Sequence, residues 1–219
     1  MFFRQIEVGQ HAVFAYLIGD PAAGEAVVVD PADEVDRLIE AAAAHGMRIR
    51  TIVNTHGHVD HVMGNAEMQE KTGASIAIHE AEADYLLRIG EFWLQMFQAR
   101  RSPPADRMLR DGDVLEVGAY RWRVIHTPGH TPGGICLYYE PQGLCLTGDT
   151  LFVGSVGRTD GPKASFAELS RSIRERLFPL PPDTEIFPGH NYGVYPTSTV
   201  ARERAFNPFV NDAYDFDLG

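Results

Sequence analysis

The chain has 219 residues, which is more than the most common domain size but within the range of one α/β or sandwich-type domain. Apolar residues make up 44% of it and charged residues 22%, a composition that is typical of folded globular proteins and excludes wholesale disorder. The formal net charge of -11 argues against nucleic acid and anionic membranes as partners, because steering a polyanion requires a positive surface.

The first residues lack the basic leader and apolar core of a secretory signal, and no apolar run approaches the roughly 18 residues that span a bilayer. We therefore expect a cytoplasmic protein that does not enter a membrane. Only two cysteines occur, Cys136 and Cys145, in consecutive predicted strands. They imply no disulfide framework, so buried reduced thiols are expected.

The first part of the chain alternates strands with helices. Val27, Val28 and Val29 form a β-branched run suited to a buried strand, which pairs with the strand before it across a turn rich in Gly and Pro. Gly46 supplies the C-terminal stop of the first helix. Strands are expected at 12–18, 26–30, 49–54 and 75–79, and helices at 34–45, 65–72 and 80–89.

The segment from 91 to 110 fits neither a clean amphipathic helix nor a strand. It contains Phe92, Trp93, Met96 and Phe97, followed by two prolines. Two interpretations of the region at about 90–110 stay open. It is a lid over an acyl or thiol group, or it is a satellite helix with an ordinary apolar face.

The remainder of the chain is rich in predicted strands. Strands are expected at 114–117, 122–126, 134–139, 144–147 and 185–187, with a helix at 165–177. Because both halves combine strands and helices, two mixed sheets covered by helices would satisfy the layering of α/β proteins. A single wound sheet fits the same periodicity. We expect residues 1–219 to form one domain.

The stretch Thr55-His56-Gly57-His58-Val59-Asp60-His61 concentrates metal-binding side chains in a loop after a strand. Neutral imidazole and carboxylate suit zinc, manganese and ferrous iron. In an extended loop, His56 and His58 would serve one ion, whereas Asp60 and His61 would serve its neighbour. Without an ion, these groups would be buried together at a high desolvation cost.

Three later loops carry one further candidate ligand each, His130, Asp149 and His190. Each loop follows a predicted strand, and glycine or proline makes a sharp turn in it. These three side chains can therefore converge on the first motif, so that ligand type, number and position together predict a metal site.

The motif His-x-His-x-Asp-His, with the three later ligands, resembles the metallo-β-lactamase superfamily over nearly the whole chain. Further stretches resemble its branch of glyoxalase II-type thioester hydrolases and persulfide dioxygenases, namely 148–152, 157–160, 188–190 and 198–209. The resemblance implies an α/β fold, a four-layer αβ/βα sandwich in which two mixed β-sheets are flanked by helices. The metals would lie at one edge between the two halves.

The resemblance also implies how the ligands divide. His56, His58 and His130 would hold one ion, Asp60, His61 and His190 would hold the other, and Asp149 would bridge them. Two divalent ions are implied, with zinc favoured and iron or manganese as alternatives. A hydroxide formed from shared water would attack the carbonyl of a thioester such as S-lactoylglutathione or a related acyl-thiol, and Asp60 would act catalytically by orienting it.

The same branch implies a second activity, that of a persulfide dioxygenase with a single Fe(II) held by His56, His130 and Asp149. The number of ligands does not separate the two activities. We expect the helical domain that helps glyoxalase II hold glutathione to be missing, since only a short tail follows His190. Arg158 and Asp160 stand where that enzyme has a lysine and a tyrosine.

Two further residues are candidates for substrate binding. Tyr192 matches a tyrosine of the glutathione pocket, and Arg158 would bind a substrate carboxylate or else pair with Asp160. A small thioester or thiol is the expected partner. The sequence does not predict the physiological substrate or the oligomeric state.

Overall fold

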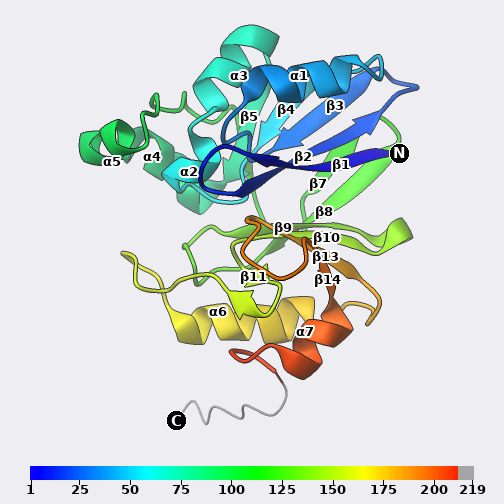
Figure 1. Cartoon of the computed structure of the whole chain (residues 1–219), viewed down its shortest axis with the longest axis vertical. Coiled ribbons are helices and arrows are strands. Elements are labelled where there is room, and N and C mark those ends of the chain that lie inside the picture. The colour runs from blue at the N-terminus through cyan, green and yellow to red at the C-terminus, as the bar shows by residue number, and fades with distance from the viewer. Residues whose placement is uncertain (212–219) are drawn as a thin grey trace.

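In the computed structural model, which describes residues 1–211, two six-stranded sheets pack face to face with helices on their outer sides (Figure 1). The first sheet has the order β1 (Phe2–Val8), β2 (Val13–Asp20), β3 (Glu25–Val29), β4 (Arg48–Val53), β5 (Ser75–His79) and β6 (Arg107–Leu109). The second has the order β14 (Ser198–Thr199), β13 (Glu185–Pro188), β10 (Leu144–Gly148), β9 (Ile135–Tyr139), β8 (Tyr120–His126) and β7 (Val114–Val117). A separate hairpin pairs β11 (Leu151–Phe152) with β12 (Ser155–Val156).

The helices divide between the two sheets as the layers in Figure 1 show. Those that accompany the first sheet are α1 (Val35–Ala43), α2 (Val59–Val62), α3 (Asn65–Thr72), α4 (Glu80–Arg88) and α5 (Glu91–Met96). Those of the second half are the short η1 (Glu140–Gln142), α6 (Phe166–Ser172), its π-helical continuation η2 (Ile173–Leu177), and α7 (Val200–Phe206). The four-layer sandwich with two mixed sheets is thus confirmed, and a single wound sheet is excluded.

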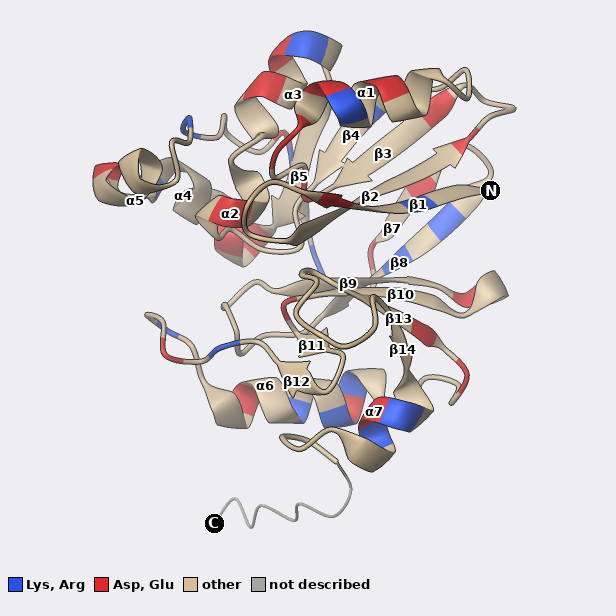
Figure 2. Ribbon diagram, viewed as in Figure 1, with Lys and Arg blue, Asp and Glu red and all other residues tan. Residues whose placement is uncertain are grey.

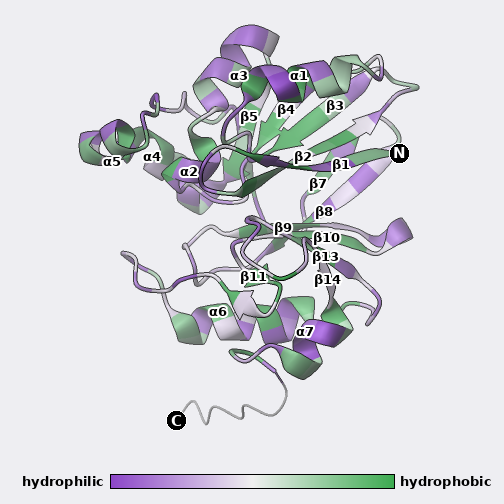
Figure 3. Cartoon of the chain, in the orientation of Figure 1, coloured by the Kyte–Doolittle hydropathy of each residue, from purple (hydrophilic) through white to green (hydrophobic). Residues whose placement is uncertain are grey.

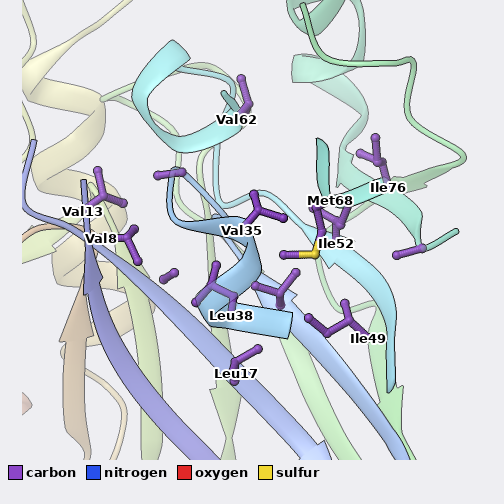
Figure 4. Close-up of a cluster of buried hydrophobic side chains, with 14 of the residues drawn as sticks. Val8, Val13, Leu17, Val35, Leu38, Ile49, Ile52, Val62, Met68 and Ile76 are labelled. Carbon is purple, nitrogen blue, oxygen red and sulfur yellow. The ribbon is translucent and has the colours of Figure 1, made fainter. Parts of the chain in front are cut away.

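Strand β2 explains why the sheets lie in the middle. Alternate side chains point to opposite faces of a strand. Leu17 packs on the helix side with Leu38 of α1, while Tyr16 packs between the sheets with Trp122 of β8. Both faces are therefore covered, and every residue of β2 is buried. Figure 4 shows the helix-side cluster around Leu17 and Leu38, and Figure 3 shows that the strands of the first sheet are largely apolar.

The second sheet uses the same alternation. Trp122 and Leu137 face the first sheet, whereas Cys136 and Cys145 face α6 and α7. Both cysteines are buried and free, as the sequence predicts. Acidic and basic residues intermingle on the outer helices (Figure 2). Within residues 1–211, the structure contains no helix with the length and apolar character that a membrane crossing requires.

Strand direction decides where the polar loops lie. In the first sheet, β3, β4 and β5 are parallel, so their carboxyl ends meet at one edge. In the second, β8 and β10 are both antiparallel to β9, and β10 is parallel to β13, so these three strands also end together. The donation of Ile135 N to Thr55 O at 2.9 Å and of Phe14 N to Gly189 O at 2.8 Å joins the two edges.

Several elements differ from the sequence predictions. Strand β1 was not predicted, because it is an edge strand whose side chains are mostly half-buried or exposed. The terminal helix α7 was also missed, although Thr199 caps it by accepting from Arg202 N at 3.2 Å. The region 91–110, for which a lid and a satellite helix were both left open, contains the short helix α5 and the strand β6, which was not predicted.

Candidate metal centre

The loop at the end of β4 carries only half of the first motif. His56 and His58 precede any helical turn, but Asp60 and His61 belong to the one-turn helix α2, in which His61 N donates to His58 O at 3.0 Å. The prediction that the whole motif is a loop is therefore wrong. The helical turn directs Asp60 and His61 towards His190, while the His61 ring also lies beside His56, with ring centroids 4.2 Å apart.

His56, His58 and His130 form the first ligand group. Their nearest ring nitrogens form a triangle: His56 Nε2 lies 3.0 Å from His58 Nδ1, and His130 Nε2 lies 2.9 Å from His58 Nδ1 and 3.3 Å from His56 Nε2. His130 Nδ1 donates to Arg158 O at 2.8 Å, so its Nε2 carries a lone pair. Three nitrogens aimed at one point fit a cation with imidazole ligands.

Asp60, His61 and His190 form the second ligand group, with ligand atoms within 4.8 Å of one another. His61 Nδ1 lies 2.9 Å from Asp30 Oδ2, and His190 Nδ1 donates to the backbone oxygen of His11 at 2.9 Å. These acceptors hold a proton on each Nδ1. The two Nε2 atoms face each other at 3.0 Å, so one cation lying between them could bind both.

Asp149 lies between the two groups. Its Oδ1 is 3.4 Å from His61 Nε2, and its Oδ2 is 3.5 Å from His130 Nε2 and 3.6 Å from His190 Nε2. Within residues 1–211, Oδ1 is buried and has no hydrogen-bond partner. Leaving a buried carboxylate oxygen unsatisfied costs free energy, so this position suits an oxygen ligand shared by two ions.

The electrostatics favour the protonation states that bind metals. Burial, followed by the neighbouring His130, lowers the pKa of His58 to about 3. Burial and then His61 lower the pKa of His56 well below its ordinary value, so both imidazoles are neutral near pH 7. Burial raises the pKa of Asp149, but His61 and then the hydrogen bond with His190 outweigh it and lower that pKa well below its ordinary value.

His61 is the exception. Burial lowers its pKa, but Asp149 and then Asp30 outweigh burial and raise the pKa to about 10. By itself, therefore, this imidazole holds a second proton at neutral pH. A cation on Nε2 would have to displace that proton.

Asp30 supports both groups and was missed by the sequence analysis. It is buried, and it accepts Thr55 N at 2.8 Å and Thr55 Oγ1 at 2.6 Å in addition to contacting His61. Because Thr55 Oγ1 gives its proton to Asp30, it accepts from His56 Nδ1 at 3.1 Å. Asp30 adopts a left-handed φ of 48°, as a constrained functional residue often does. The available signal was a carboxylate directly after a buried strand parallel to β4.

A cavity of about 210 Å³ opens onto both groups. It is lined by His58, Asp60, Asp149, Phe152, Ser155, Val156, Arg158, His190 and Tyr192. Tyr192 stacks on His190 with ring centroids 4.4 Å apart. Arg158 Nη1 lies 3.5 Å from Asp160 Oδ1, and the Arg158 side chain is 63% exposed. Both predicted substrate residues thus lie at the cavity, with Arg158 at its solvent side.

A larger cavity of about 430 Å³ lies among His11, Met63, Phe97 and Arg100. No predicted ligand lines it. The smaller cavity is therefore the one that matches the chemistry.

The terminal helix α7 shapes one wall of the site. Glu203 is buried and accepts Gly154 N at 2.8 Å, while Asn207 Nδ2 donates to Ser155 O at 2.9 Å. Both bonds hold the β11–β12 hairpin, whose residues Phe152 and Val156 line the cavity. Through these two bonds, the stretch 198–209 noted in the sequence analysis supports one wall of the cavity.

The region 91–110 is anchored at one end. Ser102 is buried and accepts Asn65 Nδ2 at 2.9 Å, whereas α5 exposes Phe92, Trp93 and Met96. None of these residues lines the 210 Å³ cavity, so a lid role for this segment stays a prediction.

The geometry agrees with the comparisons to known proteins. The family model described as the metallo-beta-lactamase superfamily matches residues 8–190. Hydroxyacylglutathione hydrolase GloC of Haemophilus influenzae is 33% identical over 192 residues, covering 85% of this chain and 87% of its own. The mitochondrial persulfide dioxygenase ETHE1 of Homo sapiens is 32% identical over 210 residues, covering 95% and 75%. The crystal structure of TTHA1623 in a di-iron-bound form has a TM-score of 0.82 and 31% identity, covering 94% and 99%.

The pKa of His61 generates a prediction about metal binding. Since that pKa is about 10, His61 is protonated at neutral pH and must release a proton when Nε2 binds an ion. We expect affinity for the second ion to fall by about tenfold for each unit that the pH is lowered below neutrality. Calorimetric titration with zinc in two buffers of different ionisation enthalpy would measure the released proton. The exposed His45→Ala variant should behave like the wild type, and identical heats in both buffers would contradict the assignment.

Proposed function

The chain belongs to the metallo-beta-lactamase superfamily, and from this premise we propose that it is a metal-dependent hydrolase of thioesters, of the hydroxyacylglutathione hydrolase type. One observation carries the proposal. The second ligand group, Asp60, His61 and His190, is as fully assembled as the first, and Asp149 lies between them. This arrangement suits two ions, and the relative TTHA1623 was solved with two irons.

Two divalent ions would supply a water of lowered pKa and positive charge for the substrate carbonyl. The donor set of imidazoles and carboxylates suits zinc, with iron or manganese as alternatives. His56, His58 and His130 would hold one ion and Asp60, His61 and His190 the other, with Asp149 shared. Asp60 is the half-buried member, with its side chain 22% exposed at the cavity. Its carboxylate is placed to hold and orient a proton of the attacking water.

The pocket walls support an acyl-thiol as the substrate. Phe152 and Tyr192 provide apolar surface beside the ligands, and Arg158 provides a guanidinium at the solvent side. A guanidinium can bind a carboxylate through two parallel hydrogen bonds, so Arg158 suits the acidic end of a thiol such as glutathione. The thiolate leaving group needs little protonation, because thiols are far more acidic than alcohols. The reaction then requires no strong general acid.

A second candidate is favoured by the likeness to the human persulfide dioxygenase over most of the chain. In that function, a single Fe(II) would be held by His56, His130 and Asp149. His130 Nε2 lies 3.3 Å from His56 Nε2 and 3.5 Å from Asp149 Oδ2, which is compatible with one shared ion. The second ligand group would then have only a supporting role.

Two assays on the purified protein separate these candidates. Release of free thiol from S-lactoylglutathione under anaerobic conditions is expected for the hydrolase. Uptake of dioxygen with glutathione persulfide, together with no thioester cleavage, would establish the dioxygenase and refute the hydrolase.

Removal of one second-group ligand tests the same proposal. His190→Ala should reduce bound metal from two ions to one and lower thioester hydrolysis by more than about 100-fold, because loss of even an outer-shell partner costs 10–100-fold. Metal content is measured by elemental analysis and activity by thiol release. Retention of full activity with one iron per chain would contradict the dinuclear hydrolase.

The role of Arg158 is tested by its side chain alone, because the backbone oxygen that orients His130 survives substitution. Arg158→Ala should raise KM for a thioester with a carboxylate-bearing thiol by about tenfold and leave kcat nearly unchanged, as loss of uniform binding does. Lys163→Ala, an exposed cation of the same loop, is the matched control. An equal rise in KM for both variants would contradict a specific role of Arg158 and would show that only the positive charge of the loop affects binding.

A further inference from the structure

A buried carboxylate on α4 lies directly behind the first ligand group. Glu82 is only 2% exposed. Its Oε2 accepts Gly57 N at 3.2 Å, and its Oε1 accepts Gly133 N at 2.8 Å. Each carboxylate oxygen therefore binds one backbone N–H group, and the two N–H groups come from different loops.

Those two loops carry the whole first ligand group. Gly57 stands between His56 and His58, and Gly133 follows His130 by three residues. The loop of Gly57 follows β4 of the first sheet, whereas the loop of Gly133 follows β8 of the second. A single side chain thus links ligand loops from both halves of the sandwich.

Both glycines are required by the close approach of α4. A Cβ on Gly57 would lie 2.8 Å from Glu82 Oε2 and 2.7 Å from Tyr85 Cδ1. A Cβ on Gly133 would lie 2.6 Å from Glu82 Cγ. These separations are shorter than packed atoms tolerate, so both loops are in direct contact with the Glu82 side chain.

The helix that presents Glu82 is itself well anchored. His79 caps the start of α4 by accepting Ala81 N at 3.3 Å, and it stacks on His126 of β8 with ring centroids 4.1 Å apart. This stack is a second link between the two halves. Glu82 is therefore held on a rigid element, as a residue that fixes a site must be.

The charge of Glu82 also matters. Its two hydrogen-bond partners are backbone amide groups, neither of which carries a full positive charge, and they belong to the loops that hold the three imidazoles. A carboxylate in a medium of low dielectric constant attracts a nearby cation more strongly than it would in water.

From these contacts we propose that Glu82 is a positioning residue for the first ion: its carboxylate fixes the spacing of the His56–His58 and His130 loops and favours the cation electrostatically. This inference rests on the proposed function, because it presupposes that these histidines bind an ion. It adds a residue that binds the backbone of both ligand loops and thereby sets the geometry of three ligands.

The test compares Glu82→Gln with Asp84→Asn. Glutamine keeps the shape of Glu82 but removes the charge and turns an NH2 group towards one of the two amide donors. Asp84 lies on the same helix, 81% exposed, and its substitution removes an equal charge from the surface. The dissociation constants of both ions are measured by titration with Zn²⁺, and the coordination geometry by the visible absorption of bound Co²⁺.

We expect E82Q to weaken one of the two sites by about 10–100-fold, to alter the Co²⁺ spectrum of that site and to leave the other site within about twofold. D84N should change neither site. A third variant, Glu82→Asp, retains the charge but is too short to reach both amides, and it should weaken the same site. It also keeps the test decisive if E82Q does not fold.

The outcomes separate this proposal from the function on which it rests. If the wild type binds two ions and both Glu82 variants bind them equally tightly with unchanged spectra, the role of Glu82 is refuted and the metal site stands. If the wild type binds no ion at all, the metal-dependent function and the role of Glu82 fail together. Equal weakening of both sites by E82Q would also refute the role of Glu82, because the proposed action is confined to the first ligand group.

Discussion

The close approach of several imidazole nitrogens around one buried carboxylate is the constraint on which the rest of the structure depends. His61 Nε2 and His190 Nε2 lie 3.0 Å apart, and Asp149 and Asp30 outweigh burial to raise the pKa of His61 to about 10, so that without a cation a proton takes its place on His61. Asp149 Oδ1 is buried beside them with no hydrogen-bond partner within residues 1–211. Such a cluster is costly by itself and favourable around cations, so the protein has to hold it together through contacts outside the ligand set.

Those contacts come from both sheets and explain the architecture. Asp30 orients His61 directly and His56 through Thr55, and the backbone oxygens of His11 and Arg158 orient His190 and His130. The strands that supply the ligand loops end at one edge because they run in the same direction within each sheet. The sandwich thus brings two sets of strand ends together at one edge, where the candidate ligands lie.

How much could be predicted from the sequence differs between ligands and supports. His130 and His190 were predictable because each stands alone in a Gly- and Pro-containing turn after a strand, where few other roles are available. Asp30 and Glu82 were harder to predict, because their partners are distant in sequence: Thr55 and His61 for Asp30, and two backbone amides for Glu82. The position of Asp30 directly after a buried strand was the signal that could have found it. Helix α2 is too short for any periodicity to reveal, so the loop prediction failed for Asp60.

The central claim is that one carboxylate joins two occupied ligand groups. Anomalous diffraction from crystals of the protein loaded with zinc tests it most directly. The account predicts two ions about 3.5 to 4 Å apart, one at each histidine group, with Asp149 between them. A single ion at full occupancy among His56, His130 and Asp149, with His61 and His190 left without a ligand under saturating zinc, would contradict it.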